Sequence, residues 1–466
     1  MTGTISTLCF FALIFAIYYI IPWKFRWMLL LAASGIFYVS ADWKMCFLIA
    51  GSVGISWIAG KQIEKADNEK MKKVWLAGCI VLLTGILFVF KYFNFFVESV
   101  NGLLELAGLG SVSFALQLLV PMGISYYTFK IISYLVDVYR GKIEAEQHFG
   151  YYALYVSFFP QILCGPIERA DHFLPQLKYG CRYEETLVTE GLERILLGMF
   201  KKLVIADRLA GYVGAVFDAP LSHPGLASLM AACFYSVQLY CDFSGYSDLA
   251  IGMAKMLGIR TRENFAYPYF SRSIKEFWTR WHISLSGWLR DYIYIPLGGN
   301  RKGKIRKHVN TMITFLVSGL WHGSSLSFVF WGGLHGLWNI ISTPKKDTDP
   351  AWKRGLQMLV TFCGVTVTWV FFRAADVKTA WTMLMHMVTD FRISVDVIIA
   401  SLLPFTGDNT CAAHFLIICL MIGFYVIYEW RKVKGKGESY GWLAVMLVMT
   451  LLFGKFGSSS FLYGNF

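Results

Sequence analysis

Ten long apolar stretches constrain the fold of this chain more than any other feature of its sequence. A helix that crosses a bilayer needs about 20 consecutive, mostly apolar residues. Interrupted apolar segments are expected either to cross or to re-enter, with their irregular backbone inside the protein. The ten stretches run over 5–21, 27–40, 45–60, 74–96, 114–138, 187–209, 226–256, 355–372, 412–430 and 440–456, and Pro or Gly interrupts 149–164 and 309–342. We predict an all-α polytopic membrane protein with about 10–12 transmembrane or re-entrant helices and additional cytoplasmic amphipathic helices.

Charge supports this class and gives an orientation. Only 16% of the residues are charged, against roughly 25% in soluble domains. The net charge of +13 is expected to mark cytoplasmic loops, since no water-soluble basic module that would bind nucleic acid is visible. Lys24 and Arg26 follow the first apolar stretch and no basic residue precedes it. That order predicts a retained helix with its N-terminus outside, and it places 255–308 in the cytoplasm.

The first candidate for chemistry is a histidine in an aromatic segment. If 277–292 forms one amphipathic helix, its Trp and Tyr residues form an apolar stripe, and His282, Ser286 and Arg290 form a polar line beside it. Such a helix is also typical of an anchor at the membrane surface, in which His282 would simply be exposed. The pattern leaves both interpretations open.

Two further histidines, His322 and His335, lie in apolar sequence framed by small residues. The frames are Gly319 to Gly323 and Gly332 to Gly336, and they allow close helix packing. An ionisable residue at membrane depth is a functional candidate, and histidine can act as a general base on a hydroxyl. The alternative, favoured for His335, is a neutral ring hydrogen-bonded to a neighbouring helix. The three histidines are too widely spaced in the sequence to match a zinc motif, so we predict no metal site.

Charged residues elsewhere add three expectations. Asp242 and Asp248 lie in a nominal span and should pair with a cation or face a wet cavity. They could orient a histidine, but we expect at least one to form a structural bridge, with Arg280 or Arg290 as the possible cation. The glycine-led basic loop 298–307 would suit a cofactor rich in phosphate, although the loop by itself favours ordinary cytoplasmic charge as the explanation.

The order of these motifs resembles the membrane-bound O-acyltransferase (MBOAT) superfamily, and most nearly its alginate O-acetylation (AlgI-like) branch. The motifs that carry the resemblance are 280–286, 288–292, 297–301 and 319–323, preceded by 121–129, 137–140, 159–161, 165–166 and 242–248 and followed by 371–374. They cover roughly 5–390, and the C-terminal remainder of the chain matches only in being hydrophobic. The resemblance implies one transmembrane domain over 1–466: N-terminal helices (1–113), a motif-bearing catalytic core (114–390) in a funnel of tilted helices, and C-terminal helices (391–466).

The resemblance also implies a function and a set of roles. His322 takes the place of the family's catalytic histidine and His282 that of its second motif histidine. No cofactor would be bound permanently; cytoplasmic acetyl-CoA would be the acyl donor. An extracytoplasmic partner of the SGNH-hydrolase type would pass the acetyl group to hydroxyls of an exported polysaccharide, which places the chain in a bacterial cytoplasmic (inner) membrane. The residues expected to bind the donor are Arg280, Arg290, Asn300, Arg301 and Lys302, and those expected to support the histidines are Asp242, Asp248, Trp321 and His335.

Two other functions fit parts of the sequence. An acyltransferase could take its acyl group from a carrier-protein thioester instead of acetyl-CoA. A transporter or flippase without acyl chemistry would also have intramembrane Asp and His residues and broken helices. The ordered motifs and the lack of a visible internal repeat count against the transporter.

Overall fold

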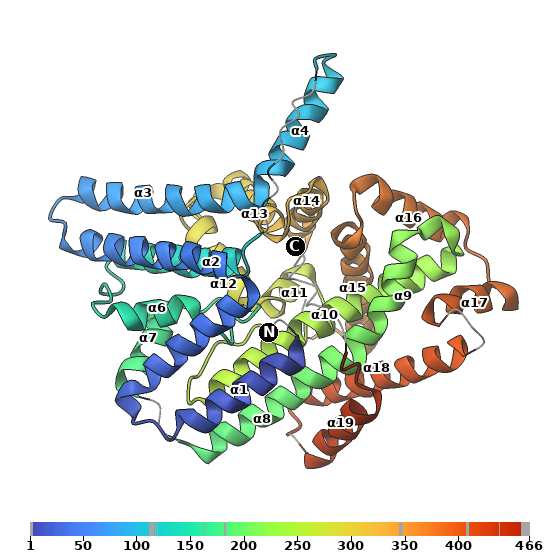
Figure 1. Ribbon diagram of the computed structural model, residues 1–466. Helices are drawn as coiled ribbons and strands as arrows, with labels where there is room; N and C mark the ends of the chain where they lie inside the picture. The colour runs from blue at the N-terminus through green and yellow to red at the C-terminus, as the bar shows by residue number, and fades with distance from the viewer. Residues whose placement is uncertain are drawn as a thin grey trace. The chain divides into compact units, whose positions relative to one another are not determined.

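The computed structural model consists of helices joined by turns and loops over the residues that it describes. It describes residues 3–457 except 111–115, 117, 119, 163, 181–182, 344–347, 407–409 and 438, and contains no strand among them. The helices form two compact units (Figure 1), the first made of Met1–Leu192 and Ala250–Arg262 and the second of Glu193–Leu249 and Glu263–Asn465. The helices α8 (Glu185–Met199) and α10 (Gly225–Met256) have residues in both units.

In the first unit, α2 packs against three other helices. It contacts α3, α5 and α6, and it consists of two apolar halves separated by the charged residues Asp42 and Lys44. Two of the predicted stretches, 27–40 and 45–60, lie within this one helix, which Asp42 interrupts with an extended backbone conformation. The elements that lie wholly in this unit are α1 (Thr4–Tyr18), η1 (Trp23–Phe25), α2 (Arg26–Lys65), α3 (Glu69–Leu87), η2 (Phe88–Tyr92), α4 (Phe93–Leu106), α5 (Ile124–Tyr139), α6 (Phe149–Ser157) and α7 (Ala170–Tyr179).

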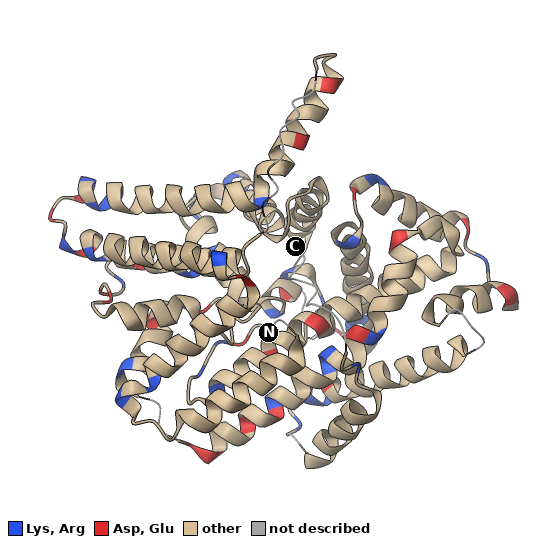
Figure 2. Ribbon diagram, in the orientation of Figure 1, with Lys and Arg blue, Asp and Glu red and all other residues tan. Residues whose placement is uncertain are grey.

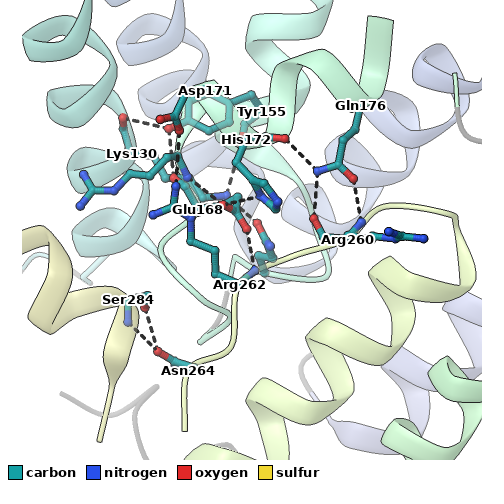
Figure 3. A network of polar contacts seen from close by, with 12 residues as sticks. Lys130, Tyr155, Glu168, Asp171, His172, Gln176, Arg260, Arg262, Asn264 and Ser284 are labelled. Atoms are coloured by element: carbon teal, nitrogen blue, oxygen red, sulfur yellow. Dashed lines mark hydrogen bonds and ion pairs between the residues drawn. The ribbon is translucent and has the colours of Figure 1, made fainter. Parts of the chain in front are cut away.

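Charged side chains concentrate at particular places in this unit. Figure 2 shows them clustered where α2 joins α3, while between their ends the two helices carry few charges, among them Asp42 and Lys44 at the kink of α2. A second group forms the network in Figure 3, where buried Glu168 accepts a hydrogen bond from the backbone N–H of Arg262 and contacts His172 at 3.1 Å. Gln176 bonds both backbone groups of Arg260. These contacts fasten α7 to the chain segment that follows α10.

The second unit contains the helices that carry the three histidines. Its closest helix pair is α13 with α14, and short turns of 3₁₀ or π form connect several other helices. The elements are η3 (Phe200–Ala206), α9 (Asp207–Asp218), η4 (Pro220–Ser222), η5 (Pro268–Phe270), α11 (Ile274–Arg280), α12 (Ile283–Leu289), η6 (Arg290–Tyr294), α13 (Gly303–His322), α14 (Leu326–Ile341), α15 (Ala351–Arg373), α16 (Val377–Thr389), α17 (Val395–Leu402), η7 (Leu403–Phe405), α18 (Cys411–Val433) and α19 (Tyr440–Phe453).

Several of these helices are long and apolar enough to cross a membrane. Among the described residues there are five, over Trp23–Lys65, Glu69–Leu106, Gly225–Met256, Ala351–Arg373 and Cys411–Val433. Shorter apolar helices lie at Thr4–Tyr18, Leu326–Ile341, Val395–Phe405 and Tyr440–Phe453. The prediction of an all-helical polytopic membrane protein is therefore confirmed.

Candidate active site

His282 and His322 lie close together in the second unit although they are far apart in the sequence. The centres of their rings are 6.4 Å apart. His282 is fully buried and His322 is 3% exposed. His322 is the last residue of α13, and His282 lies between α11 and α12.

The helix predicted over 277–292 is wrong as a single element, because the chain breaks it at Trp281 and His282. Ser273 caps α11 by accepting a hydrogen bond from the backbone N–H of Glu276, and the helix ends at Arg280. Trp281 is extended, and His282 adopts a left-handed conformation with φ of 44°. That conformation is unfavourable for a residue other than glycine, and here it turns the histidine into the protein interior. The surface-anchor interpretation of His282 is therefore wrong.

Aromatic rings and one amide surround His282. Its Nδ1 atom lies 3.0 Å from Oδ1 of Asn264, and the ring of Phe243 meets it edge-on at 4.7 Å. Burial lowers the pKa of His282 to about 3, because a buried charge loses the solvation of water. The ring is therefore neutral at physiological pH, and its nitrogen without a hydrogen can accept a hydrogen bond.

His322 owes its position to two glycines that let α13 and α14 pack closely. The Cα atom of Gly332 lies 3.4 Å from the position that a Cβ on Gly319 would occupy. The chain turns between the two helices directly after His322. The rings of Trp331 and Phe372 lie 5.2 and 5.3 Å from the ring of His322. His322 therefore lies in an aromatic setting on a rigid helix pair, as the small-residue frames predicted.

His335 has a partner at each ring nitrogen. Trp278 donates its Nε1 hydrogen to Nδ1 at 3.3 Å, and Nε2 lies 3.0 Å from the hydroxyl of Thr368. Because an indole N–H can only donate, Nδ1 must be the acceptor and Nε2 must carry the hydrogen. No lone pair is left for catalysis, so His335 is the hydrogen-bonded structural histidine that the sequence favoured.

A pocket of about 240 Å³ lies in the same unit and is lined by residues of α11 to α14. Its lining includes Ser286 and Ser318, which lie four residues from His282 and from His322 in the sequence, whereas neither histidine lines it. Arg290 and Lys307, both exposed, also line it. The pocket therefore offers two cations and two hydroxyls on the helices that carry or adjoin the histidines.

The predicted donor-binding residues divide between this pocket and its surroundings. Arg290 lines the pocket and pairs with Asp291 at 2.8 Å. Arg280 is half-buried and forms an ion pair with Glu276 at 2.8 Å. Asn300, Arg301 and Lys302 are exposed in the turn before α13. Lys307, the last residue of the basic loop 298–307, also lines the pocket.

Asp242 and Asp248 form buried ion pairs, but with different cations from those expected. Lys202 lies 2.6 Å from Asp242, and Lys201 lies 2.7 Å from Asp248. Arg194 also pairs with Asp248, at 2.6 Å. The expected structural bridge is present, whereas Arg280 and Arg290 are not its cations. The signal that would have found the partners is the pair of lysines inside the apolar stretch 187–209.

A π-helical turn explains how two consecutive lysines reach two acids on α10. Phe200–Ala206 forms this turn, which widens the helix by one residue. Lys202 also contacts Asp207 at 2.8 Å.

Trp321 is buried with its ring 5.8 Å from that of His282, so it packs beside the histidine pair.

Comparison with known proteins gives a family for this arrangement. Residues 145–342 match the model of the membrane-bound O-acyltransferase family. The chain is 40% identical to the probable alginate O-acetylase AlgI of Azotobacter vinelandii over 80% of this chain and 75% of that protein. It is 34% identical to the peptidoglycan O-acetyltransferase of Helicobacter pylori over 77% and 73%, and 30% identical to the teichoic acid D-alanyltransferase of Bacillus subtilis over 46% and 57%. This chain, a multi-pass helical membrane protein, belongs to the membrane-bound O-acyltransferase family and is an O-acyltransferase.

Proposed function

We propose that this O-acyltransferase takes an acetyl group from cytoplasmic acetyl-CoA and delivers it toward hydroxyls of an exported polysaccharide. The observation that carries the proposal is the pair of buried histidines whose ring centres are 6.4 Å apart, together with a pocket in the same unit that Arg290 and Lys307 line. Two relatives of high coverage have names that describe O-acetylation, one of alginate and one of peptidoglycan. An acetyl thioester is already activated, so the protein has to supply mainly proximity and a proton acceptor.

In the proposed reaction His322 is the general base. The acceptor hydroxyl oxygen attacks the thioester carbon, and its proton passes to the histidine as the new C–O bond forms. The C–S bond then breaks, and the thiolate of CoA receives the proton. General-base assistance of this kind typically contributes about 10²- to 10⁴-fold to the rate.

The basic residues at the pocket mouth are assigned to the donor. Arg290 and Lys307 would hold the phosphate groups of acetyl-CoA, with Arg301 and Lys302 in the exposed turn adding longer-range attraction. No cofactor would be resident. The distribution of basic residues supports a bacterial cytoplasmic membrane location with the N-terminus outside and this pocket on the cytoplasmic side.

We further propose that a separate extracytoplasmic protein of the SGNH-hydrolase type completes the transfer to the polysaccharide. The alternative donor is a carrier-protein thioester, and the similarity to a teichoic acid D-alanyltransferase over 46% of the chain favours keeping it as the second candidate. Family membership argues against the transporter or flippase.

The test is release of CoA from acetyl-CoA by the detergent-purified protein, measured with a thiol reagent. His322→Ala should lose at least 100-fold in rate while keeping acetyl-CoA binding. His414→Ala is the matched control, because His414 is an exposed histidine on α18 and should leave the rate unchanged. A wild-type protein that neither binds acetyl-CoA nor releases CoA would favour the carrier-protein donor. Equal rates for wild type and His322→Ala would refute the role of His322.

A further inference from the structure

Asn264 is a buried residue next to His282 whose amide group is fully engaged. Its Oδ1 atom accepts hydrogen bonds from the hydroxyl of Ser284 at 2.8 Å and from the backbone N–H of Ser284 at 3.3 Å (Figure 3). Its Nδ2 atom donates to the hydroxyl of Ser247 at 3.0 Å. Its backbone carbonyl accepts from the N–H of Ile283 at 2.9 Å. The residue is therefore held on both sides of its side chain and along its backbone.

These contacts determine which nitrogen of His282 carries the hydrogen. A backbone N–H can only donate, so the Asn264 atom that faces the N–H of Ser284 must be the oxygen. The Nδ1 atom of His282 lies 3.0 Å from that same oxygen and 3.5 Å from the hydroxyl of Ser284. Because that hydroxyl donates its hydrogen to Asn264 at the shorter distance of 2.8 Å, Nδ1 is the N–H nitrogen. A neutral imidazole has only one N–H, which leaves Nε2 of His282 with a bare lone pair.

The lone pair is buried where it can serve a reaction. Within the described part of the chain, Nε2 of His282 has no hydrogen-bond partner, although an unmet buried acceptor is unfavourable. Phe243 and Trp321 flank the ring, and the titratable group that faces it is His322. The acids on the neighbouring α10, Asp242 and Asp248, are paired with cations as described above.

We infer that Asn264 is a positioning residue that fixes the tautomer of His282, so that Nε2 of His282 accepts a hydrogen bond from the acceptor hydroxyl and orients it while His322 removes the proton. The inference rests on the proposed function. With a lone pair at Nε2, neutral His282 cannot donate a hydrogen bond to the thioester carbonyl, so it acts on the hydroxyl. The atoms balance as before: the proton leaves the hydroxyl oxygen for His322 and reaches the thiolate when the C–S bond breaks. The strained backbone of His282 is consistent with a position maintained for this purpose.

Two substitutions test the role through the rate. Asn264→Ala removes the oxygen that selects the tautomer, and kcat for CoA release should fall at least 10-fold while KM for acetyl-CoA changes less than 3-fold. Asn264→Asp keeps an oxygen opposite Nδ1 but adds a negative charge, which favours the imidazolium form. In the pH profile of kcat for Asn264→Asp, the acid limb should therefore shift to higher pH by at least one pH unit, and activity should recover at alkaline pH.

The control is Asn310→Ala. Asn310 is also fully buried and donates to the carbonyl of Gly299 at 2.9 Å, so its loss should reduce thermal stability without moving the pH profile. Wild-type kcat in Asn264→Ala, or an Asn264→Asp profile that superimposes on the wild type, would overturn the inference. If Asn264→Ala does not fold, the Asn264→Asp profile still decides the question.

A second measurement is independent of the donor. Nitrogen NMR of histidine-labelled protein, with His282→Gln to assign the signal, should show His282 with hydrogen on Nδ1 in wild type. An Nε2–H form would refute the inference even if acetyl-CoA is the donor. An Nδ1–H form in a protein that does not use acetyl-CoA would instead leave the tautomer assignment standing and refute the proposed donor.

Discussion

Replacement of Gly319 by alanine should separate α13 from α14 and displace the candidate base. A Cβ on Gly319 would lie 2.2 Å from the carbonyl oxygen of Phe328, whereas ordinary van der Waals contact begins at 3.4 Å. The opposing atom belongs to a helix backbone and cannot rotate away. Relief therefore requires α14 to shift by about the difference between these two distances. Overpacking usually costs about 1–3 kcal/mol, and we expect the upper end of that range.

The same chain offers a second test position and a control. A Cβ on Gly332 would lie 2.4 Å from the carbonyl oxygen of Phe315, so Gly332→Ala should behave like Gly319→Ala. A Cβ on Gly333 would meet only a leucine methyl at 3.8 Å, so Gly333→Ala should be neutral. The assays are thermal unfolding in detergent and CoA release. Both the unfolding temperature and the rate of CoA release should fall in Gly319→Ala and Gly332→Ala. Equal behaviour of all three variants would refute the close approach of the helices.

Two further predictions concern charged groups away from the histidine pair. Lys202→Met removes the cation from buried Asp242 and should destabilise the fold by about 3–5 kcal/mol, measured by thermal unfolding. Lys72→Met, in the ion pair with exposed Glu69, should cost at most about 1 kcal/mol, and equal losses in the two variants would contradict the buried pairing. The hydrogen bond between His172 and Glu168 raises the pKa of His172 above its ordinary value. Protonated His172 should therefore stabilise the fold fully below about pH 6.5 and lose this contribution as pH rises through the raised pKa. A stability difference between wild type and His172→Gln that grows with pH would refute this prediction.

Residues whose roles depend on local pattern were predictable from the sequence. The apolar stretches indicated the helical class because a membrane helix is specified by a local run of residues. The small residues around His322 predicted close packing, and Gly319 and Gly332 are the points at which the two helices approach. The small-residue frame of His335 likewise indicated a ring bonded to a neighbouring helix, although its partners, Trp278 and Thr368, lie 57 and 33 residues away in the sequence.

Residues whose roles depend on distant partners were not predictable in this way. The stripe over 277–292 has helical periodicity throughout, and nothing within it indicates that Asn264 draws the backbone into a break at His282. The cations of Asp242 and Asp248 come from α8 and the adjoining π turn. Wide separation along the sequence conceals such pairs, because a charge does not reveal its partner until the helices are packed.

The length of α14 has a consequence for the surrounding lipid. Its 16 residues span about 24 Å at 1.5 Å per residue, which is shorter than the hydrocarbon core of about 30 Å. Leu326, Leu337 and Ile341, at its two ends and along its outer face, are exposed. If α14 crosses the bilayer, acyl chains next to it must therefore compress to match its length. We expect membranes of shorter-chain lipids to accommodate this part of the protein at lower elastic cost, so membrane thickness becomes one of the conditions under which the helix pair that holds His322 is most stable.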